Sequence, residues 1–193
     1  LRRIVRATQR LDQLLTDILE LSRAQRMEPP VDEIDANQLV QEVLRRLESR
    51  IKSTCARITV RSPLPRLRVN KTWAVQGIYN LVANALKFVA PGTPPDIEIA
   101  PHIEIDLDGE EVVGLVVRDR GPGVPSDQHD RIFELFRRAV GRDIEGTGAG
   151  LAIVRQVAER HGGRTWVSPR DGGGSEFFIT FGINRQVAKE VGP

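Results

Sequence analysis

The segment Asn80-Leu81-Val82-Ala83-Asn84-Ala85-Leu86-Lys87-Phe88 is the first of three that together decide the fold. On a helix predicted from Lys71 to about Phe88, Asn80, Asn84 and Lys87 fall at i, i+4 and i+7, away from the apolar stripe. An amide oxygen is a hard, neutral ligand for Mg²⁺, and a lysine adds positive charge for phosphate. This face is therefore suited to a polyphosphate with its cation, although the segment alone is equally compatible with a solvated polar face.

The second segment places a carboxylate at the end of an apolar strand. Asp119 follows Val112–Val117 and precedes Gly121-Pro122-Gly123. Such a carboxylate can accept a hydrogen bond from the exocyclic amine of adenine, and the glycines let the backbone approach a planar base. Taken alone, the pattern is more typical of an ordinary turn after a strand.

The third segment is the glycine-rich turn Gly146-Thr147-Gly148-Ala149-Gly150, which runs into Leu151 and a predicted helix. A turn of this kind presents backbone amides and the positive end of a helix dipole, which suits phosphate. Its spacing is that of neither a Walker A loop nor a dinucleotide fingerprint. Upstream, Arg138 or Arg137 can reach a terminal phosphate, whereas the nearby phenylalanines are expected to anchor a mobile lid in the core.

The N-terminal segment shows a heptad pattern. One apolar row contains Ile4, Leu11 and Ile18, and a second row, offset by three residues, contains Ala7, Leu14 and Leu21. The pattern favours a bundle helix that needs a partner over a helix packed on its own domain. Prolines at 29 and 30 then separate it from the rest of the chain.

The remaining sequence predicts an α+β domain, with an antiparallel-rich sheet covered by helices on one face. The expected helices run from a cap at Asp35 or Asn37 to Arg50, from a cap at Asn70 to Phe88, over Asp127–Phe136 after Ser126, and over Ala149–His161. The glycines at 162 and 163 are expected to end the last helix in a left-handed stop. The expected strands are Arg57–Arg61, Ile97–Leu107, Val112–Arg118, Gly163–Val167 and Ser175–Phe181.

Composition limits the class of protein. The 193 residues carry a formal charge of +2 without a dense Lys/Arg block, which argues against a nucleic-acid binder. The single cysteine, Cys55, leaves no internal disulfide and fits a reducing, cytoplasmic location. No apolar run is long enough to span a bilayer. Because the chain starts at Leu1 inside a helical pattern, we expect a fragment whose parent can carry a membrane segment upstream.

These segments resemble a known set of motifs. Asn80–Phe88, Asp119–Gly123, Phe133–Phe136 and Gly146–Leu151 are similar to the N, G1, F and G2 boxes of sensor histidine kinases. Their catalytic domain belongs to the GHKL ATP-binding superfamily and has the Bergerat fold, an α/β sandwich. The resemblance implies a bundle helix at residues 1–28, similar to the second helix of a dimerisation and phosphotransfer hairpin. An ATP-binding domain at 29–182 and a tail at 183–193 would follow.

The resemblance also implies roles for individual residues. Asn84 would bind Mg²⁺, Asp119 would contact adenine, and Asn84, Lys87 and Arg138 would assist phosphoryl transfer. The implied nucleotide-binding set is Asn80, Asn84, Lys87, Phe88, Asp119, Gly121, Gly123, Gly146, Thr147, Gly148, Ala149, Gly150 and Leu151. The implied partners are ATP, a response-regulator receiver domain and a second copy of the chain.

The sequence departs from the family pattern at several positions. Arg120, Phe88 and Ala149 replace residues common in the family, and none of the three histidines lies in an H-box. His161 is expected at a helix end, and His102 and His129 are expected at the surface. We therefore expect the chain to bind ATP without phosphorylating itself. A GHKL ATPase or serine kinase is disfavoured. By resemblance, those enzymes have a glutamate that acts as a base at the position of Asn80, and an asparagine has no useful basicity. A degenerate scaffold should have lost boxes that this chain retains.

Overall fold

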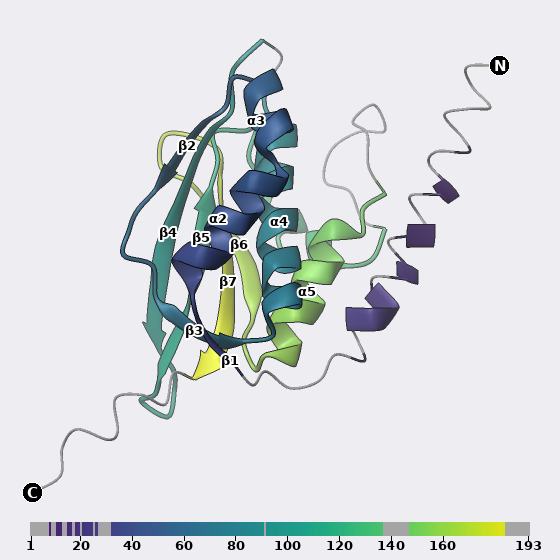
Figure 1. The fold of residues 1–193 in the computed structure, drawn as a ribbon. Helices are drawn as coiled ribbons and strands as arrows, with labels where there is room; N and C mark the ends of the chain where they lie inside the picture. The colour runs from purple at the N-terminus through teal and green to yellow at the C-terminus, as the bar shows by residue number, and fades with distance from the viewer. Residues whose placement is uncertain are drawn as a thin grey trace, which may run out of the picture.

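The computed structural model describes residues 8, 11–12, 15–16, 18–19, 21–24 and 26 of the N-terminal segment, and residues 32–90, 92–136 and 147–183. A five-stranded sheet in the order β2-β4-β5-β7-β6 forms the centre of this structure (Figure 1). Its strands are β2 (Arg57–Val60), β4 (Asp96–Ile105), β5 (Glu111–Arg118), β6 (Thr165–Pro169) and β7 (Ser175–Ile183). Only β2 and β4 pair in parallel within this sheet, so the predicted antiparallel character is confirmed.

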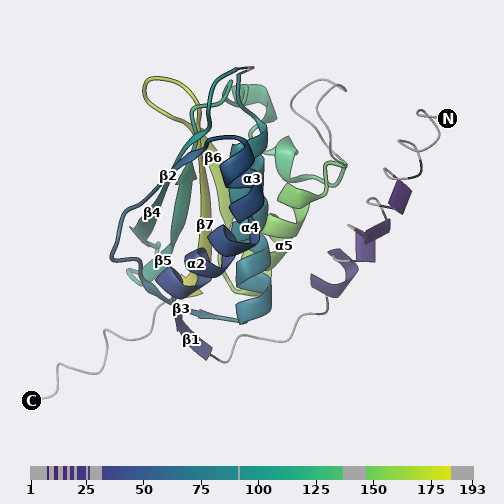
Figure 2. The same ribbon diagram turned by 45° about the horizontal axis from the view of Figure 1, so that its top comes forward.

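Helices lie on one face of the sheet, as Figures 1 and 2 show. They are α2 (Ala36–Arg46), α3 (Glu48–Ser53), α4 (Lys71–Lys87) and α5 (Gly150–Arg160). The core between the two layers is apolar, and Ile78 of α4, Leu115 of β5 and Ile153 of α5 are each at most 1% exposed. Burial of such side chains is the main favourable term for folding. The α+β class predicted from the sequence is confirmed.

A second, two-stranded sheet was not predicted. β1 (Asp32–Asp35) pairs antiparallel with β3 (Arg66–Val69). In β3 the arginines are exposed and Leu67 and Val69 are fully buried, so the alternation that marks a half-buried strand was present in the sequence. β3 leads directly into Asn70, whose Oδ1 accepts a hydrogen bond from the Trp73 N–H (3.3 Å) and caps α4 as predicted.

Two helix predictions were wrong in detail. The helix expected to continue to Arg50 is interrupted at Leu47 (φ −95°, ψ 3°), which ends α2 and precedes α3 while its side chain stays 3% exposed. The helix expected at Asp127–Phe136 is instead two short 3₁₀ turns, η1 (Ser126–Gln128) and η2 (Arg131–Phe133). Ile132 and Phe133 of η2 pack in the core, and these contacts hold the segment although it lacks continuous helical hydrogen bonds.

At the start of α2 the choice between two caps is settled. The Asp35 carboxylate accepts a hydrogen bond from the Asn37 N–H (2.8 Å), so Asp35 is the N-cap. At the end of α5, Gly162 adopts φ +74°, which confirms the predicted left-handed stop.

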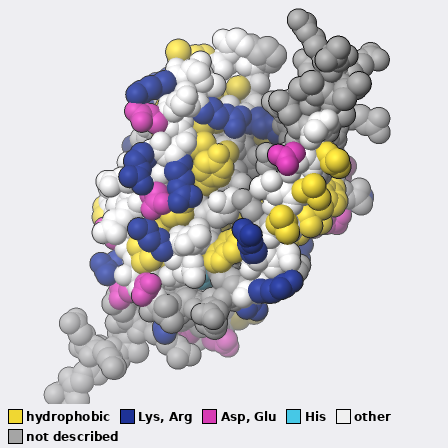
Figure 3. All heavy atoms as spheres, turned by 45° about the vertical axis from the view of Figure 1, so that its right-hand side comes forward, with side chains coloured by type: hydrophobic (Ala, Val, Ile, Leu, Met, Phe, Trp, Pro, Cys, Tyr) yellow, Lys and Arg dark blue, Asp and Glu magenta, His cyan; other side chains and the backbone are white. Residues whose placement is uncertain are grey.

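The described residues of the N-terminal segment between 8 and 24 are helical. Four of its described large apolar side chains are exposed, and Figure 3 shows a patch of hydrophobic side chains on one face of the molecule. The four exposed side chains are Leu11, Leu15, Ile18 and Leu19. Near the end of the segment Leu21 packs against the domain core and Ala24 is fully buried. Within the described ranges, no helix combines the length and apolar character needed to cross a membrane.

Candidate functional site

Asn80 lies on α4 with an unsatisfied amide group. Its Nδ2 atom is buried and has no hydrogen-bond partner, the one such side-chain nitrogen or oxygen among the described residues. A buried donor without a partner costs free energy, and such a group in a native structure calls for an explanation. The carboxamide lies beside the first residue of α5, because an ideal Cβ on Gly150 would be 3.6 Å from Asn80 Oδ1. The N box and the G2 box therefore meet here.

The start of α5 lacks the usual side-chain cap. Ala149 is the N-cap residue, and no side chain there accepts a hydrogen bond from the first turn. The Ala149 N–H itself donates to Thr147 Oγ1 (3.4 Å), and Gly148 adopts φ +84°. Uncapped amides of a helix N-terminus are a suitable environment for phosphate. The predicted glycine-rich turn thus leads into an α5 terminus with a free capping position.

Asp119 is a buried carboxylate at the end of β5. It is 6% exposed, and its Oδ1 accepts a hydrogen bond from the Gly121 N–H (2.7 Å). Burial raises the pKa of the Asp119 carboxyl above its ordinary value, and the amides of Gly121 and Ser175 and the charge of Arg170 act in the opposite direction. A desolvated acceptor of this kind is well suited to an amine on a planar ligand.

The end of α4 packs directly against the segment after Asp119. An ideal Cβ on Gly121 would lie 2.2 Å from the Phe88 carbonyl oxygen, so only glycine allows this approach. The neighbouring Lys87 places its Nζ 4.5 Å from the centroid of the Phe88 ring. Phe88, Lys87, Gly121 and Asp119 are therefore brought together, as the nucleotide-site prediction requires.

The F and G2 boxes are also joined. The Phe136 N–H donates to the Gly148 carbonyl (3.2 Å), which ties the two flanks of residues 137–146 to each other. Phe133 is 4% exposed and belongs to the core, as predicted, whereas Phe136 is 47% exposed. Arg138 and Gly146 lie outside the described residues.

The three histidines occupy different surroundings. His161 is 6% exposed at the end of α5, its Nε2 accepts from the Asn70 N–H (3.0 Å), and its Nδ1 donates to the Val157 carbonyl (2.7 Å). Burial lowers the pKa of His161 below its ordinary value. His102 and His129, predicted at the surface, are half-buried, and His102 makes edge contacts with the rings of Trp166 and Phe178.

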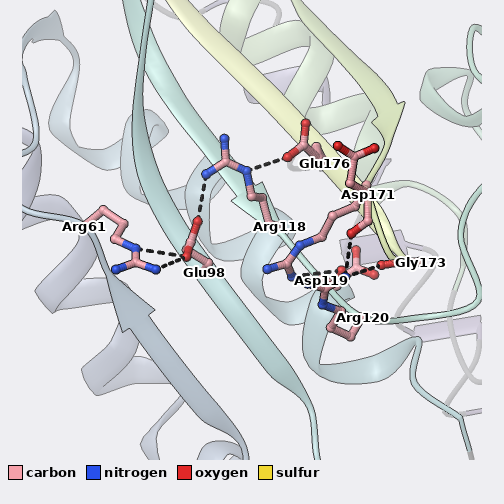
Figure 4. A network of polar contacts seen from close by, with 9 residues as sticks. Arg61, Glu98, Arg118, Asp119, Arg120, Asp171, Gly173 and Glu176 are labelled. Carbon is pink, nitrogen blue, oxygen red and sulfur yellow. Dashed lines mark hydrogen bonds and ion pairs between the residues drawn. The ribbon is translucent and has the colours of Figure 1, made fainter.

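Sequence reasoning missed the residues that hold Asp119 from the β6–β7 turn. The Asp119 N–H donates to the Ser175 carbonyl (2.9 Å), and the Asp119 carbonyl accepts from Arg170 Nη1 (3.2 Å). The signal that could have indicated a close approach was the run Gly172-Gly173-Gly174. Figure 4 shows Asp119 and Arg120 beside this turn, next to an ion-pair chain formed by Arg61, Glu98, Arg118 and Glu176.

With this geometry established, the chain can be compared with known proteins. Residues 69–185 match the family described as histidine kinase-, DNA gyrase B-, and HSP90-like ATPases. The chain belongs to this family. Its predicted GHKL character is thereby confirmed, and the fold is that of histidine kinase catalytic domains.

Individual relatives are histidine kinases and phytochromes. The chain is 35% identical to the methanogenesis regulatory histidine kinase FilI of Methanothrix harundinacea strain 6Ac, over 92% of this chain and 19% of that protein. It is 32% identical to cyanobacterial phytochrome B of Nostoc sp. strain PCC 7120, over 92% of this chain and 23% of that protein. The chain thus spans about a fifth of the length of these relatives.

A solved structure agrees with this assignment. The crystal structure of full-length ShkA in complex with AMPPNP matches 88% of this chain and 35% of ShkA, with a TM-score of 0.71 and 29% identity. The match therefore extends over most of the chain.

Proposed function

We propose that this chain is the ATP-binding catalytic region of a two-component sensor histidine kinase, which transfers the γ-phosphoryl group of ATP to a histidine outside this sequence. The observation that carries the proposal is the buried, unpartnered Nδ2 of Asn80 beside the uncapped start of α5. Asp119, buried where the end of α4 approaches Gly121, supplies the acceptor for an adenine amine. Residues 29–182 form the nucleotide-binding domain, residues 1–28 the second hairpin helix and residues 183–193 a tail.

Different residues contact the base, the phosphates and the metal ion of the nucleotide. Asp119 accepts a hydrogen bond from the adenine amine, and Gly121 and Gly123 allow the base to lie against the backbone. Asn80, Thr147, Gly148, Ala149, Gly150 and Leu151 lie along the phosphates, together with Gly146, Lys87 and Phe88. Asn84 would hold Mg²⁺ through its amide oxygen, and the ion would neutralise phosphate charge when bound. Lys87 and Arg138 stabilise the charge of the transferred phosphoryl group, because phosphoryl transfer depends mainly on positioning and electrostatics.

Transfer to a protein histidine is favoured over hydrolysis by the chemistry of Asn80. A carboxamide has no useful basicity, so it cannot activate water for attack on the γ-phosphate. The relatives that are histidine kinases support the same choice. The AMPPNP complex of ShkA supports an adenine nucleotide as the ligand of this fold.

The partners follow from the N-terminal helix and from the reaction. The exposed side chains Leu11, Leu15, Ile18 and Leu19 leave an apolar face that a second copy of the chain can cover in a four-helix bundle. The phosphorylated histidine would then donate to a response-regulator receiver domain. We propose that the catalytic region acts in the cytoplasm, whatever membrane attachment the parent protein has.

Nucleotide titration of the chain tests the binding step. We expect ATP to bind with an affinity that falls when EDTA replaces Mg²⁺, and we expect Asn84→Ala and Asp119→Ala to weaken binding without unfolding the domain. In the parent protein, Asp119→Ala should abolish the acid-labile phosphohistidine formed with labelled ATP. Wild-type protein without Mg²⁺-dependent affinity for ATP or ADP would contradict the proposal, as would rapid ATP hydrolysis by the purified chain alone.

A further inference from the structure

The turn between β6 and β7 folds back onto the end of β5. An ideal Cβ on Gly174 would lie 2.1 Å from the Asp119 carbonyl oxygen, and Gly174 adopts φ +99°, so no other residue fits this contact without strain. The turn is closed by its own backbone bonds, from the Arg170 N–H to Gly174 O (3.2 Å) and from the Gly173 N–H to Arg170 O (3.0 Å). A rigid turn therefore rests against the backbone of the predicted adenine acceptor.

Two arginines reach across this contact in opposite directions. From the β5 side, Arg120 Nη1 donates to the carbonyls of Asp171 (2.7 Å) and Gly173 (3.2 Å), as Figure 4 shows. From the turn, Arg170 Nη1 donates to the Asp119 carbonyl (3.2 Å). Hydrogen bonds from a charged donor are stronger than those between neutral groups. Each segment thus supplies the donor that satisfies the other segment's carbonyl groups.

We propose that Arg170 and Arg120 form a reciprocal clamp that positions the Asp119 carboxylate for the adenine amine. The inference rests on the proposed function, and it makes both arginines positioning residues that act through Asp119. With its N–H bonded to Ser175 and its carbonyl bonded to Arg170, Asp119 has little freedom left in its backbone. The carboxylate is fixed as well, by its bond from the Gly121 N–H. A preorganised acceptor of this kind binds its ligand without further ordering cost.

The charges around Asp119 support a particular role for Arg170. Burial raises the pKa of the Asp119 carboxyl, and Arg170 is the charged residue that opposes this shift. Arg120 and Asp171 belong to the same contact, and Lys87 lies at the end of α4, over the ring of Phe88. Glu176 of β7 is paired with Arg118. Removal of the Arg170 charge should therefore let Asp119 protonate at a higher pH than in the wild-type protein.

The test compares two nucleotides that differ only in the exocyclic amine, ATP and purine riboside triphosphate. Arg170→Gln should weaken MgATP binding about fivefold to tenfold, the effect of one charge-assisted hydrogen bond, and leave purine riboside triphosphate within about twofold. The acidic limit of MgATP binding should move to higher pH in R170Q and stay in place in Arg170→Lys, which keeps the charge. Arg120→Gln should reduce the ATP preference less, about twofold to threefold, because Arg120 does not bond to Asp119 itself.

Arg164→Gln is the matched control. Arg164 is bound to Glu104 and lies over the Trp166 ring, away from Asp119, so R164Q should keep the wild-type preference for ATP. Should R170Q fail to fold, R120Q supplies the same comparison from an exposed side chain. Equal losses for both nucleotides, or unchanged binding in R170Q and R120Q, would overturn the clamp while leaving the proposed function intact. A wild-type chain with no affinity for MgATP would overturn both.

Discussion

The two ends of the α4–α5 pair are built differently. At one end, where α4 begins and α5 finishes, the polar groups bond to one another: Asn70 caps α4, its N–H donates to His161, and His161 donates to Val157. At the other end, Asn80 Nδ2 has no partner and the first turn of α5 has no side-chain cap. We call the first end, whose polar groups are satisfied within the protein, the joint. We call the second end, together with Asp119 and Gly121 beside the end of α4, the ligand end.

Stability and ligand binding are therefore assigned to different ends of the helix pair. Groups satisfied within the protein contribute to folding, and their loss leaves a buried partner unpaired. Groups left unsatisfied cost stability and persist where a ligand completes them. Substitutions at the joint should therefore lower the free energy of unfolding and leave nucleotide affinity unchanged. Substitutions at the ligand end should lower nucleotide affinity, and they should lower stability as well only where the new side chain does not fit.

The largest effect is expected from Gly121→Ala at the ligand end. Its Cβ would overlap the Phe88 carbonyl, and because both partners are backbone, relief requires α4 to move. We expect a loss of about 3 kcal/mol or more in the free energy of unfolding and MgATP affinity below detection. Chemical denaturation and calorimetric titration measure the two quantities.

Gly109→Ala is the control for this change. Unlike Gly121, Gly109 has positive φ (+80°), but its Cβ would meet nothing within 4 Å. This variant should lose about 1 kcal/mol from backbone strain alone and bind MgATP normally. Wild-type affinity in G121A would show that the nucleotide does not depend on this approach of α4.

At the joint, His161→Ala should lower stability without lowering nucleotide affinity. The substitution leaves the Asn70 N–H and the Val157 carbonyl without the ring and removes its contact with Phe181. We expect a loss of about 2–3 kcal/mol in the free energy of unfolding. MgATP affinity, measured where the protein is folded, should stay within about twofold of the wild-type value. An affinity loss without a stability loss would reverse the assignment of the two ends.

Two asparagines, Asn80 within α4 and Asn70 at its N-cap, give a sharper comparison. Asn80→Ala removes an unpaired amide, so the free energy of unfolding should change by less than about 1 kcal/mol while MgATP affinity falls about tenfold. Asn70→Ala removes the cap of the same helix and should cost about 1 kcal/mol with no change in affinity. If N80A proves the more destabilising of the two and binds MgATP normally, Asn80 belongs to the fold and not to the site.

The smallest effect is the pH dependence of stability, and its sign differs between the two ends. His161 has a lowered pKa in the folded protein, so its stabilisation is full above the unfolded value of about 6.5 and declines as pH falls toward the folded value. Asp119 has a raised pKa, so it favours folding more as pH falls from its folded value toward about 3.9.

Variants separate these two contributions in denaturation curves between pH 4 and pH 8. Relative to wild type, His161→Gln should lose less stability on acidification below about pH 6.5, by at most about 1.4 kcal/mol per pH unit. Asp119→Asn should lack the gain at lower pH. Identical pH slopes in H161Q and wild type would mean that His161 titrates normally.

Local sequence signals predicted the elements that carry the candidate site. The cap at Asn70, the helix through Asn84, the strand ending before Asp119 and the stop at Gly162 all depend on neighbouring residues, and the structure contains each of them. The roles assigned to Asn84, Lys87 and Arg138 stay predictions. Because these signals act over a few residues, they were readable without tertiary contacts.

The features that were missed depend on distant partners. β1 is four residues long and exists because it pairs with β3, whose sequence lies more than thirty residues away. The 3₁₀ turns before Phe136 form because Ile132 and Phe133 are anchored in the core. Similarly, nothing local to Arg170 indicates that its side chain bonds to Asp119. Tertiary packing overrides propensity at such positions.

Hydrogen–deuterium exchange of the chain with and without MgADP distinguishes the joint from the ligand end in one experiment. We expect added protection at residues 80–88, 119–123 and 147–151, with exchange at residues 70–74 and 157–163 unchanged. Protection confined to the joint, or none at the ligand end at saturating MgADP, would contradict this expectation.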